Sequence, residues 1–301
     1  MRDQLLRGLW VAALTPLAAD RSVDVPAFAK HCRWLIDCGC DGVALFGTSG
    51  EGPHFTVRER IAALEGVLKA GIPPERVVVG TGCVAIPDAV ELTRHALGCD
   101  IAAAMLLPTF FVKKQGDAEV EAGIAAVVEA AADPRLRLIV YHIPSWSAVE
   151  IGIGAVKALR RRFGEVIAGI KDSSGDWAHF ETYLAAVPEL RLFTGSEAHF
   201  AKALARGAAG TICGLGNVAP RTMAALKAGG AGAAGAQREI EAICGFYDAH
   251  SFLPTVKTML ATLTGEPGWR RLRPPLVEPD AAETAAIVAA TRELLQKAKA
   301  A

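Results

Sequence analysis

The chain has no excess of charge of either sign, because 32 Lys and Arg residues balance 32 Asp and Glu residues. A balanced chain lacks the positive surface that attracts nucleic acid or an anionic membrane, so a small neutral or acidic metabolite is the expected partner. Although 51% of the residues are hydrophobic, no uninterrupted apolar run reaches the ~20 residues that a bilayer span requires. Residues 1–8 also lack the pattern of a secretory signal. We therefore expect a soluble, cytoplasmic protein with no nucleic-acid or membrane partner.

The cysteines lack any arrangement typical of a zinc site. None of the seven forms a CxxC pair accompanied by a second pair, or by histidines at zinc spacing. Their number is odd and they are scattered through apolar segments, so we expect reduced core thiols and no disulfides. Cys83 follows a strand end and could line a site there, but a small buried hydrophobic residue is the favoured interpretation.

What the chain does contain is a regular alternation of short apolar runs and longer segments with helical periodicity. The runs are continuous in Val, Ile, Leu and Ala, which is typical of strands buried on both faces of a parallel sheet. The predicted strands are residues 9–14, 42–46, 76–80, 101–107, 138–142, 166–171, 190–194 and 210–213. The predicted helices are residues 26–38, 57–70, 87–98, 119–131, 153–163, 177–187, 199–206 and 221–228. Eight strand–helix units in about 230 residues predict an α/β fold, a (β/α)8 TIM barrel over residues 1–228.

The remaining residues, 229–301, are expected to form a C-terminal helical extension. Three further helices are predicted at residues 236–250, 253–263 and 281–298. This segment is too short to own a separate core, so its helices should pack on the barrel or mediate assembly. The Gly/Ala tract at residues 228–236 is interpreted as a flexible connection, because no strand precedes it and no Lys-Ser/Thr follows.

Polar residues stand at the carboxyl ends of the predicted strands, where barrel enzymes carry their catalytic groups. Lys171 ends the sixth strand, and desolvation at such a position can make an unprotonated amine available to attack a ketone. The alternatives for Lys171 are an ordinary surface lysine or a partner of Asp172. Tyr141 ends the neighbouring fifth strand, and a phenol beside an amine can deliver and withdraw protons near the nucleophile. Other strand ends carry Thr15, residues 47–51, His142, residues 195–197 and Gly214.

Four of these segments together resemble the dihydrodipicolinate synthase / N-acetylneuraminate lyase superfamily of Schiff-base aldolases. They are GTSGE at residues 47–51, YHIPS at 141–145, GIKDSS at 169–174 and GTICG at 210–214. The resemblance implies that Lys171 forms a Schiff base with pyruvate or a related 2-oxo acid while Tyr141 relays protons. It further implies 2-oxo acid contacts from Gly47, Thr48, Ser49 and Ile212. It also implies chemistry without a metal or cofactor, and a homo-oligomer that is a dimer or a tetramer.

Two positions depart from the pattern of the dihydrodipicolinate synthases. The relay tyrosine that a neighbouring subunit lends becomes Phe110, and a phenyl ring cannot pass a proton. The arginine after Pro-Ser, which holds the carboxylate of the acceptor, becomes Trp146, and indole offers one N–H donor in place of a bidentate clamp. We therefore expect the acceptor to be a less acidic aldehyde, hydroxylated or aromatic. Packing at a subunit contact is the alternative role for Trp146.

The sequence leaves the roles of several further residues near these segments undecided. His142, together with His54 and Phe55, is a candidate for lining the same pocket, or it is a core histidine. Glu51 and Glu197 are candidates for orienting Thr48 or the acceptor, and for Glu197 an exposed carboxylate at a helix start is the favoured interpretation.

The expected activity is that of a class I aldolase or lyase acting on a 2-oxo acid and an aldehyde. One alternative is a dihydrodipicolinate synthase proper. Another is a Schiff-base dehydratase or hydratase-aldolase acting on a keto sugar acid or an aromatic 2-oxo acid. A third, of a different class, is a non-catalytic barrel that binds a 2-oxo acid.

Overall fold

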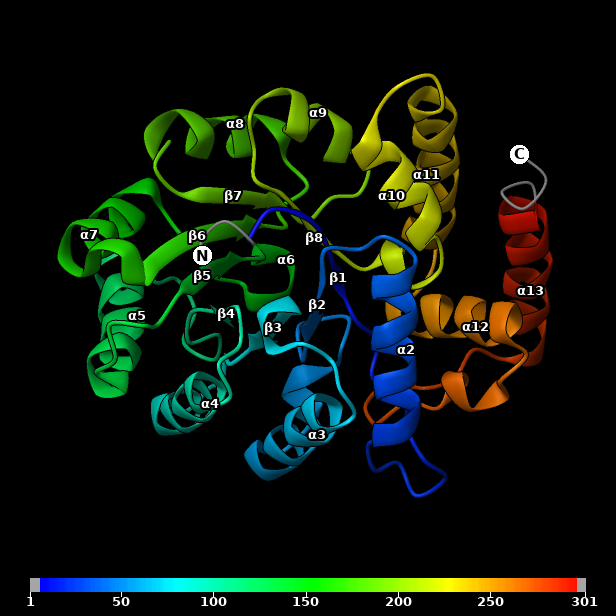
Figure 1. Ribbon diagram of the computed structural model, residues 1–301, viewed down its shortest axis with the longest axis horizontal. Coiled ribbons are helices and arrows are strands. Elements are labelled where there is room, and N and C mark those ends of the chain that lie inside the picture. Colours follow the sequence, from blue (N-terminus) through cyan, green and yellow to red (C-terminus); the bar gives the residue numbers. More distant parts are fainter. Residues whose placement is uncertain (1–5, 297–301) are drawn as a thin grey trace.

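The computed structural model describes residues 6–296 and contains a closed barrel of eight parallel strands surrounded by helices (Figure 1). Each strand pairs with the next along the chain, and β8 closes the barrel on β1. The strands are β1 (Gly8–Ala12), β2 (Gly42–Leu45), β3 (Val77–Gly80), β4 (Ala103–Leu106), β5 (Leu138–His142), β6 (Ile167–Asp172), β7 (Arg191–Thr194) and β8 (Gly210–Cys213). The prediction of a (β/α)8 barrel is confirmed.

The helices alternate with the strands as the periodicity predicts. They are α2 (Val25–Asp37), α3 (Val57–Lys69), α4 (Ile86–Gly98), α5 (Asp117–Ala131), α7 (Ile153–Phe163), α8 (Trp177–Ala186), α9 (Phe200–Ala205) and α10 (Pro220–Ala228). Shorter helical turns lie in the connections: η1 (Gly52–His54), η2 (Pro74–Arg76), α6 (Pro144–Ser147), η3 (Gly164–Val166) and η4 (Leu215–Asn217). The turns are too short to show a hydrophobic period, so periodicity alone does not find them.

Side-chain caps begin several of the helices. Asp24 accepts a hydrogen bond from the N–H of Ala27 at the start of α2, and Thr56 forms a capping box with Glu59 in α3. Asp176 caps α8 in the same manner. These side chains satisfy backbone N–H groups that the first turn of a helix leaves unpaired.

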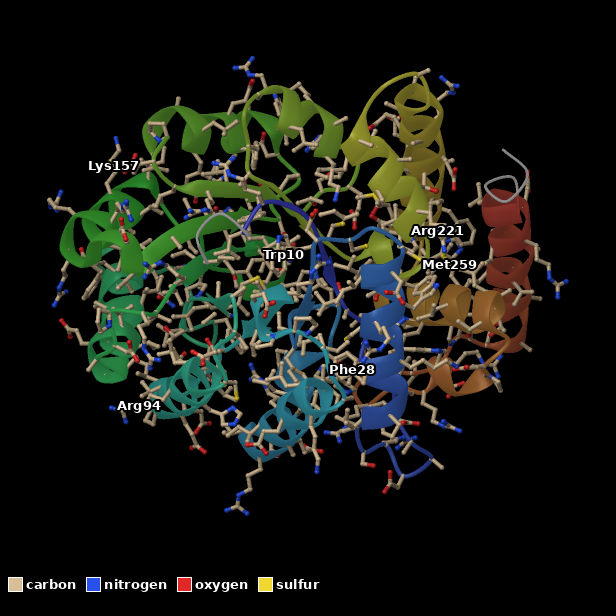
Figure 2. The ribbon with its side chains drawn as sticks, viewed as in Figure 1. Trp10, Phe28, Arg94, Lys157, Arg221 and Met259 are labelled. Atoms are coloured by element: carbon tan, nitrogen blue, oxygen red, sulfur yellow. The ribbon has the colours of Figure 1, made fainter. Side chains whose placement is uncertain are left out.

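The inside of the barrel is filled with side chains, as in other barrels of this size. Trp10 of β1 and Phe193 of β7 are at most 1% exposed. Gly42 makes room for the indole, because a Cβ at this position would lie 2.2 Å from Trp10 Cζ3. Figure 2 shows Trp10 among the strands, whereas Arg94 of α4 and Lys157 of α7 point outward from the surrounding helices. The interior of the barrel is therefore a packed core with no room for a ligand, which leaves the mouth as the place for the strand-end residues to act.

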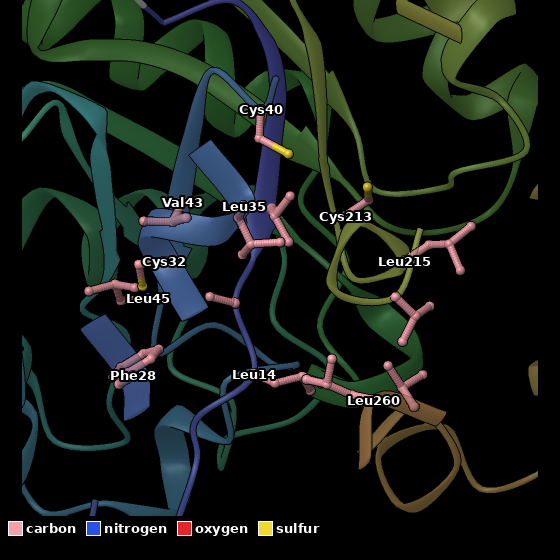
Figure 3. Packing of buried hydrophobic residues seen from close by; sticks show 14 of the residues in the cluster. Leu14, Phe28, Cys32, Leu35, Cys40, Val43, Leu45, Cys213, Leu215 and Leu260 are labelled. Atoms are coloured by element: carbon pink, nitrogen blue, oxygen red, sulfur yellow. The ribbon is translucent and has the colours of Figure 1, made fainter. Parts of the chain in front are cut away.

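The C-terminal extension consists of α11 (Ala233–Asp248), α12 (Phe252–Thr264), the turn η5 (Pro267–Arg270) and α13 (Ala281–Gln296). In Figure 1 α11 lies beside α10 and α12 lies beside α2, whereas α13 lies at the outer edge, next to α12. One buried cluster joins Leu260 of α12 to Leu14, which follows β1, and to Leu35 of α2 (Figure 3). The extension therefore shares its core with the outer layer of the barrel.

Two expectations about the extension need adjustment. Helix α11 begins inside the Gly/Ala tract, so only residues 229–232 connect it to α10. Residues 297 and 298, the predicted end of the last helix, lie outside the described residues. None of the described helices combines the length and the apolar character needed to cross a bilayer.

Candidate active site

Strands β5 and β6 place the two predicted catalytic residues side by side. Tyr141 is the register partner of Lys171 across the two strands, and both side chains are buried. The Nζ atom of Lys171 lies 4.1 Å from the centre of the Tyr141 ring. Asp172 does not pair with this amine, because it accepts hydrogen bonds from His179 and from the N–H of Ser174. Lys171 is therefore neither a surface lysine nor the partner of its neighbour in sequence.

The loop after β2 brings hydroxyl groups to the same place. Thr48 Oγ1 and the Tyr141 hydroxyl are 3.1 Å apart and share a hydrogen bond. Ser49 is buried against the loop after β8, where a Cβ on Gly214 would lie 3.0 Å from Ser49 Oγ. Ile212 of β8 is fully buried in the same cluster as Tyr141. The structure thus collects at one mouth the residues that four separate sequence segments indicated.

Backbone contacts hold the loop after β2 in a tight turn. The N–H of Gly52 donates to the carbonyl of Gly47 at 3.1 Å, and Thr15 Oγ1 donates to the carbonyl of Gly50 at 2.7 Å. Glu51 adopts a left-handed conformation with φ of 56°, which is uncommon for a residue with a Cβ. A strained backbone conformation of this kind persists only where surrounding contacts hold it in place. In addition to the hydrogen bonds of the loop, an ion pair of the Glu51 side chain holds it here.

A buried ion pair joins this loop to the C-terminal extension. Glu51 Oε1 pairs with Nζ of Lys257 in α12, and both side chains have no exposed surface. Lys257 also donates to the carbonyl of Arg271 at 2.9 Å. Burial acts to raise the pKa of Glu51, but His54 and Lys257 outweigh it, so the pKa lies below its ordinary value and the carboxylate is charged at neutral pH. Sequence reasoning missed this pair, because nothing in the sequence connects Glu51 with a lysine on a distant helix.

Two cavities meet at Thr48. A small one of about 20 Å³ borders Gly47 and Tyr141 as well as Thr48. A larger one of about 190 Å³ borders Thr48, Phe110 and Trp146. Because Thr48 lines both, the two cavities are neighbouring parts of one site, with Tyr141 on one side and the two aromatic rings on the other. A wider cavity of about 500 Å³ between α2 and α10 borders none of these residues.

His142 does not face this site. It follows Tyr141 in β5, so its side chain points to the opposite face of the strand. There it stacks on His179 of α8, with ring centroids 4.7 Å apart, and its Nδ1 accepts a hydrogen bond from the N–H of Ile151. Burial lowers its pKa. The expectation that His142 lines the substrate pocket is therefore corrected, and its alternative role as a core histidine fits the structure.

The surroundings of His142 also bear on metal binding. His142, Glu150 and His179 each place a potential ligand atom within 4.8 Å of the others. However, His142 Nδ1 already accepts an N–H, so the neutral ring carries its proton on Nε2, which lies 3.3 Å from Glu150 Oε2. A metal at Nε2 would require the loss of that proton as well. The protonation of His142 therefore fits poorly with a cation held by these three residues.

Glu197 is buried, contrary to the expectation of an exposed carboxylate. Its Oε1 accepts hydrogen bonds at 2.9 Å from the N–H groups of Gly214 and Leu215. Its Oε2 accepts one at 2.8 Å from the hydroxyl of Tyr247 in α11. Burial and then the charge of Glu197 raise the pKa of Tyr247. Glu197 thus ties the loops after β7 and β8 to the C-terminal extension.

Comparison with known proteins relates this site to a family. The model of the dihydrodipicolinate synthetase family matches residues 5–294. An uncharacterized DapA-like lyase of Chloroflexus aurantiacus is 35% identical over 294 residues, which cover 96% of this chain and 97% of the relative. A 4-hydroxy-tetrahydrodipicolinate synthase of Acidithiobacillus ferrooxidans is 30% identical over 223 residues, covering 74% of this chain and 75% of that protein.

Solved structures agree with the sequence comparison. Dihydrodipicolinate synthase from Agrobacterium tumefaciens has a TM-score of 0.89 at 31% identity, covering 95% of this chain and 99% of that one. A prophage protein of the same family from Escherichia coli, solved in complex with pyruvate, has a TM-score of 0.86 at 24% identity, covering 96% and 98%. At 24% identity, the similarity to the Escherichia coli protein supports a shared fold and nothing more. The chain belongs to the dihydrodipicolinate synthetase family, whose members are lyases and aldolases.

Proposed function

We propose that this protein is a class I aldolase or lyase in which Lys171 forms a Schiff base with pyruvate or a related 2-oxo acid. The observation that carries the proposal is the buried amine of Lys171 over the ring of Tyr141, whose hydroxyl is hydrogen-bonded to Thr48. A sheltered primary amine beside a group that can pass protons is what Schiff-base catalysis requires. The pyruvate complex of the fold neighbour from Escherichia coli agrees with this choice of ligand.

The proposed reaction uses few protein groups. Lys171 Nζ adds to the C2 carbonyl of the 2-oxo acid, and the resulting carbinolamine loses water with a proton supplied by Tyr141. The iminium then withdraws electrons, so that the C3 proton passes to the phenolate of Tyr141 and an enamine forms. The enamine carbon attacks the aldehyde carbon, and Tyr141 returns the proton to the aldehyde oxygen as the new C–C bond forms. Hydrolysis of the iminium releases the product and restores the amine, and the reverse sequence cleaves the same bond.

Short polar groups next to the lysine would hold the carboxylate of the 2-oxo acid. The side-chain hydroxyls of Thr48 and Ser49, with the backbone N–H groups of their glycine-flanked loop, are donors of the size and kind that suit an anion. The hydroxyl of Thr48 is also hydrogen-bonded to Tyr141, whose ring lies beside the amine of Lys171. This arrangement supports 2-oxo acid binding at the inner part of the site.

The outer cavity supports an acceptor aldehyde without a carboxylate. Phe110 and Trp146 line it, and no Lys or Arg is among its lining residues in the described part of the chain. The carboxylate of Glu51 lies in its wall as one half of an ion pair with Lys257, so this side of the cavity offers no unpaired cation to a second carboxylate. These features argue against the aldehyde used by a dihydrodipicolinate synthase proper, because that acceptor carries a carboxylate.

Exposed apolar side chains near the same mouth support a homo-oligomer, a dimer or a tetramer. Phe111, Val112 and Trp146 are 77%, 61% and 56% exposed. Lys113 connects their two segments by donating to the carbonyl of Ser147 at 3.0 Å. Large apolar groups gathered at a surface are typical of a protein contact. Light scattering should give the mass of a dimer or tetramer, and a monomer at micromolar concentration would contradict this part of the proposal.

Borohydride reduction in the presence of pyruvate tests the proposed function. The wild-type chain should gain the mass of one reduced pyruvate adduct and lose activity, whereas the Lys171→Arg variant should gain none. Lys202→Arg is the matched control, because Lys202 Nζ also lies over an aromatic ring, 4.0 Å from the centre of Trp177, but at the surface. A wild-type protein without an adduct, or a Lys171→Arg variant that still forms one, would refute the proposal.

Product analysis then distinguishes the reaction types. Reversible formation of aldol products from pyruvate and an aldehyde supports the aldolase. Release of water from a hydroxylated 2-oxo acid without C–C cleavage would instead show a dehydratase on the same lysine. An adduct with neither reaction would show a barrel that only binds the 2-oxo acid.

A further inference from the structure

Two buried polar atoms in the wall of the outer cavity lack hydrogen-bond partners. They are Oε2 of Glu51 and Nδ1 of His54: the two face each other as an ion pair, but neither forms a hydrogen bond within the described residues. Both residues line the cavity of about 190 Å³, together with Thr48 and Trp146. Buried polar atoms are almost always paired, so an unpaired couple at a cavity indicates that something from outside completes it.

The distance between the two atoms limits which chemical groups can form hydrogen bonds to both. Glu51 Oε2 and His54 Nδ1 are 3.7 Å apart, which is too far for a hydrogen bond to each other, since such bonds span ~2.7–3.2 Å. One oxygen atom placed between them can still lie within hydrogen-bond distance of both. A hydroxyl suits the gap, because it donates its proton to the carboxylate and accepts one from the ring N–H.

The charges and the burial of Glu51 and its neighbours argue against a cation, an anion or an alkyl group at this position. Glu51 Oε1 is already paired with Lys257, so the carboxylate is neutralised inside the protein. A second cation at Oε2 would meet the ammonium of Lys257 across the same carboxylate, and an anion would meet the carboxylate itself. An alkyl group would leave both polar atoms desolvated and unpaired, which is costly. A neutral O–H group satisfies all of these conditions, and it belongs to water in the free protein or to a hydroxyl of the substrate that displaces this water.

The size and position of the cavity determine where the hydroxyl sits in the substrate. A volume of about 190 Å³ has room for a short aldehyde. Thr48 borders both this cavity and the one beside Tyr141. An aldehyde that reacts near Tyr141 would therefore extend past Thr48 and place its far end at Glu51 and His54.

We propose that Glu51 and His54 form a hydroxyl-binding pair that selects a short hydroxyaldehyde as the acceptor. This inference rests on the proposed function, because it concerns the second substrate of the Schiff-base reaction. Lys257 acts through Glu51 as a positioning residue that keeps the carboxylate charged and turned toward the cavity. Trp146 and Phe110 cover the carbon chain of the aldehyde.

The test compares two aldehydes of equal size in condensation with pyruvate. Glycolaldehyde and propanal have the same number of non-hydrogen atoms and differ in a hydroxyl against a methyl group. The measured quantity is the ratio of kcat/KM for glycolaldehyde to that for propanal, and its change on mutation removes the intrinsic difference in reactivity. In His54→Phe the ratio should fall by about tenfold or more through a higher KM for glycolaldehyde, with propanal little affected.

Three further variants complete the comparison. His54→Gln retains an N–H donor and should keep most of the preference. His95→Ala is the matched control, because His95 also pairs with a glutamate, at 2.9 Å from Glu65, and its side chain is similarly exposed, 21% against 25% for His54. That variant should leave the ratio unchanged. Glu51→Gln should reduce the ratio as His54→Phe does, and thermal unfolding of each variant shows whether it is folded.

The outcomes separate this inference from the proposed function. If the wild-type chain forms no reduced adduct with pyruvate, the proposed function itself fails. If the adduct forms in the wild type and in His54→Phe but the aldehyde ratio is the same in both, the hydroxyl-binding pair is wrong while the Schiff base stands. An adduct in both, with the ratio lowered only in His54→Phe and Glu51→Gln, supports the pair.

Discussion

Replacing Lys257 by methionine should destabilise the protein strongly, although the residue lies outside the barrel. The side chains of Lys257 and Glu51 have no exposed surface, so the variant leaves a buried carboxylate without its counter-charge. Removing one member of a buried ion pair costs about 3–5 kcal/mol. For a chain of 301 residues, a change of 1 kcal/mol shifts the melting temperature by roughly 1.6 °C, so Tm should fall by about 5–8 °C.

A double-mutant cycle isolates the pair from other effects of the substitution. Unfolding in urea, followed by circular dichroism, gives the free energy of unfolding of Lys257→Met, Glu51→Gln and the double variant. Because the double variant contains no unpaired buried charge, it should be more stable than Lys257→Met alone. Lys30→Met, which breaks an exposed pair with Glu266, should change stability little. Strictly additive effects at Glu51 and Lys257, or a Lys257→Met variant as stable as the wild type, would refute the reasoning.

Three further predictions concern pH, catalysis and specificity. Burial lowers the pKa of His31 from 6.5 to about 4, so its contribution to stability is complete above pH 6.5 and is lost as the pH falls toward 4. In urea titrations the wild type should therefore lose about 3 kcal/mol between pH 7 and pH 4 that His31→Gln does not lose, and equal losses would contradict this. Tyr141→Phe should lower kcat by about 10²–10⁴-fold in steady-state assays, and an unchanged kcat would remove Tyr141 from the proton transfers. Trp146→Arg should raise kcat/KM for a carboxylate-bearing aldehyde about tenfold or more relative to an uncharged one, whereas an unchanged ratio would show that Trp146 does not contact the acceptor.

The sequence predicts the barrel and the inner part of the site because both depend on local patterns. Continuous apolar runs mark the strands, and polar residues at the ends of these runs lie at the mouth in any parallel barrel. Lys171 and Tyr141 are candidates because of their positions at strand ends, the family resemblance supplies their expected roles, and the structure places them in register on β5 and β6. The ends of elements are less well defined, since β6 continues through Asp172 and β1 ends at Ala12.

The parts that sequence reasoning misses depend on contacts between distant segments. The burial of Glu197 follows from the N–H groups after β8 and the hydroxyl of Tyr247, which the sequence does not place beside it. The ion pair of Glu51 with Lys257 has the same character. His142 differs, because side chains alternate along a strand. If Tyr141 faces the inside of the barrel, the next residue must face out, so this error could have been avoided.

Identification of the modified lysine tests whether Lys171 is the residue that forms the Schiff base. After reduction with borohydride in the presence of pyruvate, the protein is digested and the adduct is located by tandem mass spectrometry. We expect a single modified residue, Lys171, with the buried Lys257 and the exposed Lys202 unmodified. The absence of an adduct, or its location on any other lysine, would show that Lys171 is not the Schiff-base residue.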